Sequence, residues 1–356
     1  MNSKITTRQL SIFIIIGFFI TKIHALPALM ANYVDESLYL PILINFLIDF
    51  LLLLVVISLN KSNETFLTLQ QNTFGKVGGK IVCFFYFLFF MAKALVPIFE
   101  QESSIELTFY ETQPLLITFL PYFAICFYFI IKGFKAILKS IEILLPFFII
   151  SIFVIVFLSL GEARFSSLLP LFSKSPMQIL KSSLFTLIWF GDPIYILYFS
   201  GHLDFSKNYK KSVITSFIIT AIFTTFFFIL FYAVFDSISP RQYFAPIKMS
   251  KYSLTLSNIG RLDYLSSMIL TLISTFITTL PLVFASLSLN DCFNFKNKFI
   301  SPIIVVLLQF ILAIITENDF LRSIKFISNY VVYFFIIMTY VLPFIIFLKA
   351  KRRKNV

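Results

Sequence analysis

Ten apolar segments, each close to the length that a helix needs to cross a lipid bilayer, dominate this chain. About 20 apolar residues span the hydrocarbon core, and backbone groups there have no water to bond, so such segments must be helices. The composition agrees, since 59% of the residues are hydrophobic and 13% are charged, with a mean hydropathy of +0.93. We therefore predict an all-α integral membrane protein with a single transmembrane domain over residues 1–356. Its ten predicted transmembrane helices cover residues 9–30, 38–59, 81–105, 114–133, 137–160, 182–200, 211–235, 262–288, 299–316 and 327–348.

The connections between these segments are short. The longest are residues 60–80 and 236–261, and we predict both as loops because neither is long enough for a soluble domain. Residues 248–256 form an amphipathic stretch, which predicts a short helix lying at the surface.

The net charge of +12 raises the possibility of a nucleic-acid partner, but the positions of the charges argue against it. The basic residues lie in short loops between apolar segments, which is the pattern of topology signals. Lys and Arg are about twice as frequent on the side that holds the N-terminus, so we predict that both termini are cytoplasmic. The basic tail, residues 349–354, would then lie against anionic headgroups.

Motifs for catalysis or metal binding are missing from the sequence. Gly75 to Gly79 does not have the spacing of a phosphate loop and lacks the Ser or Thr after its Lys. The three cysteines, Cys83, Cys126 and Cys292, stand alone and show no metal or redox spacing, so we interpret them as small packed side chains. We predict that the chain is not an enzyme and binds no cofactor and no metal.

Two of the predicted spans are interrupted at corresponding positions. Ten spans divide into two halves of five, and because five is odd, the second half starts on the opposite face, as in inverted repeats. Span 1 contains Gly17, the polar stretch 21–24 and Pro27, and span 6 contains the break 191–193. Interruptions at matching positions in two halves indicate a binding site at the midplane of the membrane.

At these residues the chain resembles the B-subunit family of spore germination receptors. The resemblance covers essentially the whole chain, and its motifs are individually weak but moderately specific together. It rests on Ile5-Thr6-Thr7-Arg8-Gln9-Leu10, Leu26-Pro27, Asn72-Thr73-Phe74-Gly75-Lys76-Val77-Gly78-Gly79-Lys80, Leu168-Leu169-Pro170, Phe190-Gly191-Asp192 and Gly260-Arg261-Leu262-Asp263.

What the resemblance implies is a ten-span, transporter-like member of the amino acid–polyamine–organocation transporter superfamily, with a five-plus-five inverted repeat and broken helices 1 and 6. Family B subunits sense small germinants, commonly amino acids, in the inner membrane of the spore. They work with an A subunit and a C lipoprotein subunit. Two departures leave the identity of the ligand open: the stretch 21–24 has no Gly, and Asp192 stands before Pro193 where many relatives have a Glu after the Gly.

Asp192 and Lys22 are the charged residues at the two interruptions. An acid at bilayer depth usually faces a cavity or a partner, so Asp192 is either a ligand or proton site or a structural acid. Lys22 lies near mid-depth and could bind a carboxylate, replace a coupling cation, or pair with Asp192. Because spans 1 and 6 cross near their breaks in this superfamily, the resemblance makes that pair geometrically plausible.

Other polar residues in the spans leave alternatives open. His24 is either a proton site or a hydrogen-bonded packing residue. Lys93 and Glu100, seven residues apart in span 3, share one helix face and belong to a structural network or to a cavity wall. Asp49 could be a packing residue or face water. Arg261 and Asp263 are expected to flank the end of span 8 and to snorkel.

From these features we predict a midplane pocket formed by the interruptions of spans 1 and 6, with spans 3 and 8 as walls. Half-helix N-termini favour an anionic group and freed carbonyls accept an ammonium, which suits a zwitterionic amino acid. Three hypotheses follow: a germinant receptor subunit, an amino acid permease that needs no partner, and an assembly subunit with a vestigial pocket. The predicted ligand-binding residues are Thr21, Lys22 and Ile23 for the carboxylate, Phe190, Gly191 and Asp192 for the amine, His24 beside them, and Lys93 as a candidate for the pocket wall.

Overall fold

The computed structural model describes residues 4–60, 64–109, 115–205, 208–252, 262–316 and 320–354. These residues form helices, with an isolated β-bridge between Ile5 and Leu203. By length and composition, six helical stretches could cross a membrane: Leu26–Leu59, Phe66–Ile105, Phe134–Leu160, Tyr209–Arg241, Ser267–Phe293 and Arg322–Lys351. Three shorter apolar helices are Thr7–Ile20, Leu120–Lys132 and Ile300–Ile315.

The first predicted span consists of two helices. Helix α1 (Thr7–Ile20) begins at Thr6, whose side chain forms a capping box with Gln9 and satisfies backbone donors of the first turn. The helix ends at Ile20, and after five intervening residues α2 (Leu26–Val34) begins with a proline in its first turn, where proline is tolerated. We call residues 21–25 the first interruption.

The sixth predicted span is also divided. Helix α7 (Pro176–Thr186) and the 3₁₀ turn η3 (Leu187–Trp189) form its first part, and α8 (Ile194–Tyr198) forms its second. Between them Gly191 has a φ of +78°, a left-handed conformation that disfavours residues with a Cβ. We call residues 190–193 the second interruption.

The other helices surround these two divided spans. The last predicted span is a run of short helices separated by two π-helical turns, Ile327–Val331 and Ile337–Val341. In chain order the remaining elements are η1 (Asp35–Leu38), α3 (Tyr39–Leu59), α4 (Phe66–Phe109), α5 (Leu115–Lys132), α6 (Phe134–Leu160), η2 (Phe165–Leu168), α9 (Tyr209–Phe235), η4 (Asp236–Arg241), α10 (Ala245–Tyr252), α11 (Leu262–Phe293), α12 (Ile300–Thr316), α13 (Phe320–Phe326), α14 (Val332–Ile336) and α15 (Leu342–Lys354).

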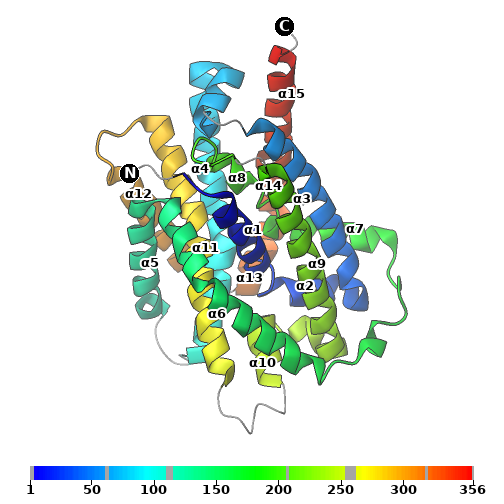
Figure 1. Cartoon of the computed structure of the whole chain (residues 1–356). Coiled ribbons are helices and arrows are strands. Elements are labelled where there is room, and N and C mark those ends of the chain that lie inside the picture. Colours follow the sequence, from blue (N-terminus) through cyan, green and yellow to red (C-terminus); the bar gives the residue numbers. More distant parts are fainter. Residues whose placement is uncertain are drawn as a thin grey trace.

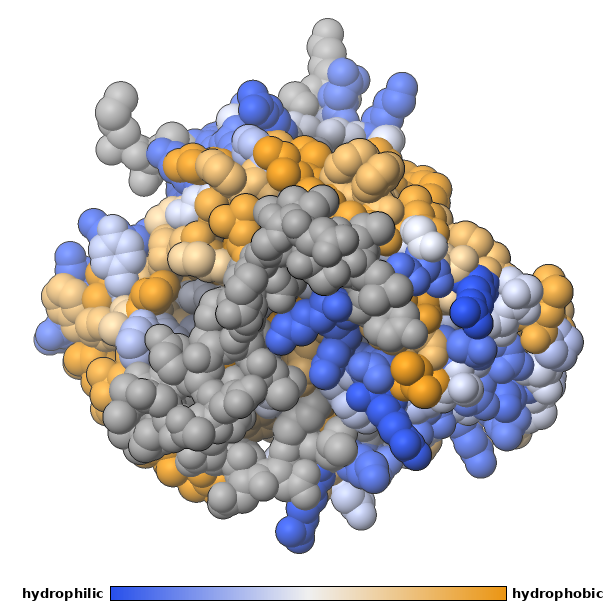
Figure 2. All heavy atoms as spheres, turned by 90° about the horizontal axis from the view of Figure 1, so that it is seen from below, coloured by the Kyte–Doolittle hydropathy of each residue, from blue (hydrophilic) through white to orange (hydrophobic). Residues whose placement is uncertain are grey.

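Helix α1 lies inside the bundle, where it contacts α6 and α9, while α4 packs along α11 (Figure 1). The start of α1 and the end of α15 lie towards the top of that view, and α10 lies towards the bottom. Large apolar side chains such as Ile143, Ile222 and Leu47 are exposed on the outside, as expected for a surface that faces lipid. The face seen from below has hydrophilic side chains beside broad hydrophobic areas (Figure 2).

The prediction that residues 60–80 form a loop is wrong for most of that stretch. Helix α4 begins at Phe66 and continues through the polar residues, with one non-helical residue, Gly75. Phe66 is buried against Tyr86 and Tyr198, with ring centroids 5.1 and 4.8 Å away. Because apolar side chains on one face dock this segment, its polar residues can stay helical on the other face.

The predicted surface helix at residues 248–256 corresponds in part to α10 (Ala245–Tyr252). This helix is more deeply packed than predicted, because Ala245 and Met249 are buried and the amide of Ala245 donates to the carbonyl of His24 at 3.1 Å. Arg261 lies outside the described residues, and so does the side chain of Asp263.

Candidate ligand site at two helix interruptions

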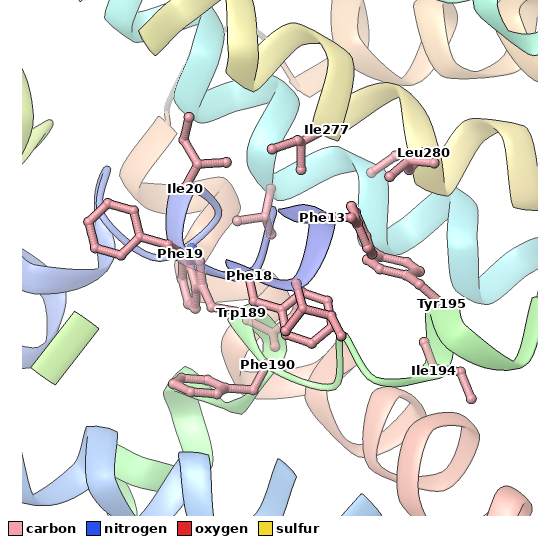
Figure 3. Close-up of a cluster of buried hydrophobic side chains, with 14 of the residues drawn as sticks. Phe13, Phe18, Phe19, Ile20, Trp189, Phe190, Ile194, Tyr195, Ile277 and Leu280 are labelled. Atoms are coloured by element: carbon pink, nitrogen blue, oxygen red, sulfur yellow. The ribbon is translucent and has the colours of Figure 1, made fainter. Parts of the chain in front are cut away.

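The two interruptions meet in the interior of the protein, and aromatic and aliphatic side chains surround them. Figure 3 shows Phe18 and Phe19 from α1 close to Trp189 and Phe190 from the second interruption and its approach. All four side chains are buried. Polar groups placed here are therefore removed from water and need partners within the protein.

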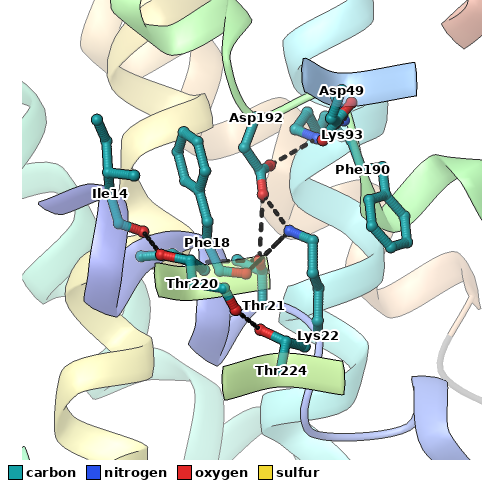
Figure 4. A network of polar contacts seen from close by, with 12 residues as sticks. Ile14, Phe18, Thr21, Lys22, Asp49, Lys93, Phe190, Asp192, Thr220 and Thr224 are labelled. Atoms are coloured by element: carbon teal, nitrogen blue, oxygen red, sulfur yellow. Dashed lines mark hydrogen bonds and ion pairs between the residues drawn. The ribbon is translucent and has the colours of Figure 1, made fainter. Parts of the chain in front are cut away.

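The centre of the site is a cluster of three charged side chains. The Lys22 ammonium lies 2.5 Å from Oδ2 of Asp192, and the Lys93 ammonium lies 3.1 Å from Oδ1 (Figure 4). The hydroxyl of Thr21 donates to Oδ2 at 3.4 Å. Lys22 is 0%, Lys93 6% and Asp192 1% exposed, so the pairing is a buried one. The pairing of Lys22 with Asp192, one of the alternatives that the sequence left open, is present, and Lys93 joins it from α4.

Each lysine also caps a helix end. The last carbonyls of a helix have no partner within it, and cations are favoured there. Lys22 donates to the carbonyl of Phe18 at 2.9 Å, near the end of α1. Lys93 donates to the carbonyl of Phe190 at 2.7 Å, just after η3. The two interruptions thus have the same arrangement. At each of them one lysine ammonium bonds both a freed backbone carbonyl and Asp192.

Aromatic faces complete the surroundings of the two ammonium groups. The Lys22 nitrogen lies 5.0 Å from the ring centroid of Phe190 and 5.7 Å from that of Phe18. The Lys93 nitrogen lies 5.5 Å from the ring centroid of Tyr195. Ring faces attract cations, so these contacts replace part of the lost hydration.

A second carboxylate, Asp49 of α3, holds the second interruption in place. Its two oxygens accept from the backbone amide of Gly191 at 2.9 and 3.0 Å, and Oδ1 also accepts from the Tyr340 hydroxyl at 2.7 Å. An amide freed by the break in the helix is thereby satisfied. Asp49 is therefore a structural anchor of the interruption, which decides between the two sequence-based alternatives in favour of packing.

Glu100 links the two interruptions at another level of α4. Its Oε1 accepts from the indole nitrogen of Trp189 at 2.8 Å and from the amide of Ala25 at 3.4 Å. Lys93 and Glu100 both belong to α4, and they contact different partners: Asp192 and the Phe190 carbonyl for Lys93, Trp189 and the Ala25 amide for Glu100. Helix α4 is thus the wall against which both interruptions rest.

His24 and Ile23 occupy a different place from the charge cluster. Ile23 is completely buried among apolar residues. His24 is 6% exposed, and neither ring nitrogen bonds to any residue that the structure describes. Buried polar atoms are nearly always bonded, so this ring differs from the other polar side chains of the site, whose partners lie among the described residues.

The formal charges of four side chains at the two interruptions balance when Glu100, which bonds Trp189 and Ala25, is left out of the count. In their ordinary states at pH 7, Lys22 and Lys93 contribute two positive charges, and Asp49 and Asp192 contribute two negative ones. A ligand with a net charge would upset this balance in a medium of low dielectric constant, whereas a zwitterion would not.

Three residues of the site were missed by the sequence analysis: Trp189, Thr339 and Tyr340. A buried tryptophan next to a break needs a partner for its N–H, and this signal could have identified Trp189. Thr339 and Tyr340 belong to the π-helical turn Ile337–Val341, which packs them against Gly191 and Asp49. The apolar sequence of the last span gives no sign of that turn.

Gly191 is required by the backbone and by close packing. At its φ of +78°, a Cβ would lie 2.4 Å from Cγ2 of Thr339. We expect Gly191→Ala to lower the free energy of unfolding by about 1–3 kcal/mol through backbone strain alone. Thermal unfolding of the purified protein in detergent measures this. The matched control is Gly161→Ala, because Gly161 has a φ of −65° and its Cβ would meet only Leu158 O at 3.6 Å. Equal stability of both variants would contradict the strained geometry.

Comparison with known protein families identifies the chain's relatives. The profile of the spore permease family, whose members are described as spore germination proteins, matches residues 4–321. The chain belongs to the spore permease family. Like the family as a whole, it is an integral membrane protein of permease or receptor type rather than an enzyme. No curated protein matches the sequence.

Two crystal structures of a manganese transporter from Eremococcus coleocola resemble this spore permease family member. A histidine-to-alanine mutant of that transporter matches with a TM-score of 0.56 at 11% identity, over 92% of this chain and 76% of the other. The complex with an aromatic bis-isothiourea-substituted compound matches with a TM-score of 0.52 at 10% identity, over 96% and 75%. At these identities the likeness establishes a transporter-like fold alone. The described part of this chain has no group of three or more His, Cys, Asp or Glu side chains placed to hold a metal ion.

Proposed function

We propose that this chain is the transporter-like subunit of a spore germinant receptor and that it binds a small zwitterion, an amino acid, at the two interruptions. The observation that supports this most strongly is the buried Lys22–Asp192–Lys93 cluster between two broken helices, in a chain of the spore permease family. Ten spans in a five-plus-five inverted repeat, with both termini cytoplasmic, form the framework of the proposal.

The ligand is proposed to enter the cluster by replacing existing ion pairs. Its carboxylate takes the place of Asp192 as the partner of Lys22, with Thr21 and the backbone of Ile23 close by. Its ammonium binds Asp192 and the carbonyl of Phe190, where it meets the same kind of acceptors that Lys93 uses now. Because the formal charges of Lys22, Lys93, Asp49 and Asp192 balance, a zwitterion exchanges partners among them without adding net charge.

Ligand binding can produce a signal only if the ligand prefers one of two states. The cluster connects α1, α4 and the second interruption, so an exchange of partners for Lys22 changes how α1 is held against its neighbours. His24, whose ring nitrogens bond to no described residue, offers a further contact that only the liganded state would use.

The start of the chain is tied to the second divided span, which suggests how the change reaches partner subunits. The amide of Ile5 donates to the carbonyl of His202 at 2.7 Å, and the amide of Asp204 donates to the carbonyl of Ile5 at 2.9 Å. Movement of α1 therefore also moves the segment that follows α8. We propose that the A subunit and the C lipoprotein subunit of the receptor respond to this end of the molecule.

A permease that moves its substrate without partners is the second candidate. It is favoured by the likeness of the fold to a solved transporter. In that case the same pocket would open alternately to the two sides of the membrane.

Uptake and germination assays distinguish the two candidates. For a receptor subunit, we expect proteoliposomes that contain only this chain to show no uptake of labelled amino acid above protein-free liposomes. Spores that lack the chain but keep the A and C subunits should not respond to the germinant, and restoring the chain should restore the response. Concentrative uptake by the chain alone would overturn the receptor proposal in favour of the permease.

A further inference from the structure

A cavity with polar groups of its own is lined by Trp189, the residue that precedes the second interruption. It has a volume of about 220 Å³ and lies between α2, the α7–η3 segment and the start of the last span. At roughly 30 Å³ per water molecule, this is the space of about seven waters, close to the size of a small amino acid. Residues that line it include Asn32, Tyr33, Phe185, Trp189, Lys325 and Ser328.

The walls of this cavity are aromatic, and it has one charged group. The rings of Tyr33 and Phe185 lie 5.8 Å apart by their centroids, and Trp189 and Tyr243 complete the aromatic lining. Among the described lining residues the charged one is Lys325, whose side chain belongs to an exposed residue of α13. Ser328 stands in the π-helical turn Ile327–Val331, and such turns are frequent at functional sites.

Trp189 lines this cavity and is followed in the chain by Phe190 of the second interruption. Its indole nitrogen is held by Glu100 at 2.8 Å, and its side chain is 4% exposed. The next residue, Phe190, gives its carbonyl to Lys93 in the cluster. A molecule in the cavity is thus one residue of chain away from the interruptions.

We propose that this cavity is a vestibular binding site, in which Lys325 binds a carboxylate and the aromatic walls receive the apolar body of a small amino acid before it passes Trp189. The proposal rests on the proposed function in one respect: the same molecule goes on to the charge cluster. In this site the ammonium group of Lys325 would bind the ligand's carboxylate, and the aromatic ring faces would attract the ligand's own ammonium.

The chain contains a single tryptophan, which lines this cavity and precedes the second interruption, so its fluorescence responds to a ligand at either place and the variants below assign the change to the cavity. The experiment uses the full chain in lipid nanodiscs, excited at the red edge where tyrosine does not absorb, and titrated with L-valine and with L-valinamide. We expect a saturable change in Trp189 emission with L-valine. L-valinamide, which lacks the carboxylate, should bind at least about tenfold more weakly.

Substitutions of Lys325 test its role in the cavity. Lys325→Ala should weaken L-valine binding at least about tenfold, and Lys325→Arg should restore most of it. The matched control is Lys181→Ala, which removes the same charge from an exposed position on α7 outside the cavity lining. Equal binding of valine and valinamide, no emission change at all, or an equal effect of the Lys181 and Lys325 variants would each overturn the vestibular site.

A third variant separates this inference from the proposed function. Asp192→Asn removes the negative charge of the central cluster and leaves the residues that line the cavity unchanged. The Trp189 emission of this variant should therefore still respond to L-valine. If Asp192→Asn spores germinate normally while the emission response persists, the central site fails and the vestibular site stands. If Asp192→Asn abolishes germination but wild-type emission never responds, the vestibular site fails alone.

Discussion

Replacing Asp192 with Asn is expected to abolish the germinant response and to lower the free energy of unfolding by about 3–5 kcal/mol, because it leaves two buried ammonium groups without their anion. Both oxygens of Asp192 are engaged, Oδ2 by Lys22 at 2.5 Å and Oδ1 by Lys93 at 3.1 Å. The Asn side chain is neutral and has an NH₂ group in place of one carboxylate oxygen, so it can keep only one of these two contacts. Chemical unfolding in detergent and germination of spores with the variant chain measure the two effects.

A surface ion pair provides the matched control for this variant. Lys174 lies 2.6 Å from Asp35, but both side chains are partly exposed, at 27% and 48%. Exposed pairs contribute about 0–1 kcal/mol, so Asp35→Asn should change stability little and leave the response intact. A loss of stability in Asp192→Asn no larger than that in Asp35→Asn would contradict a buried, fully engaged Asp192.

The second large effect is expected at Asp49. Asp49→Ala removes the acceptor of the Gly191 amide and of the Tyr340 hydroxyl, and each buried donor left without a partner costs about 1–3 kcal/mol. The second interruption should then loosen and weaken ligand binding, because the backbone that presents Phe190 and Asp192 is no longer fixed. Unfolding free energy and ligand affinity of the purified variant are the measurements.

Tyr340→Phe isolates one of the two contacts of Asp49. It removes the hydroxyl bond at 2.7 Å and keeps the anchor to Gly191. We expect a loss of about 1 kcal/mol and unchanged affinity, since a typical hydrogen bond contributes about 0.5–1.5 kcal/mol. If Tyr340→Phe weakened ligand binding as much as Asp49→Ala, the anchoring of Gly191 would not be the reason.

Much of the helical organisation could be predicted because lipid imposes it. Long apolar segments have no alternative to helix, so the described parts of the predicted segments are helical except at the interruptions 21–25 and 190–193 and at a few end residues. The interruptions could also be predicted, because the polar stretch after Ile20 and the Gly191–Pro193 break are unusual within apolar sequence. The prediction of a loop at residues 60–80 was wrong because the polar residues there resemble a loop. The segment is kept helical by the burial of Phe66, which is a tertiary contact.

The site was predictable only as far as local signals reach. Lys22 and Asp192 stand out as charges in apolar segments, and the family resemblance, which implies that spans 1 and 6 cross near their breaks, made their pairing plausible. Lys93 reaches the same carboxylate because of the way α4 is rotated about its own axis. The sequence does not determine this rotation, so it leaves several partners possible for Lys93. The contribution of Tyr340 depends on a π-helical turn, and such a turn changes which face of a helix a residue occupies.

The most direct test of the central claim is equilibrium binding of a labelled amino acid to the variant Lys22→Met/Asp192→Asn. Asp192→Asn leaves the ammonium groups of both Lys22 and Lys93 without their anion, whereas in the double variant only that of Lys93 lacks its anion, so the double variant should be more stable than Asp192→Asn alone. We predict that it folds, and that it binds the amino acid that saturates the wild-type chain at least about a hundredfold more weakly, because the groups for carboxylate and amine are both gone. Wild-type affinity in the folded double variant would show that the ligand does not bind at the interruptions.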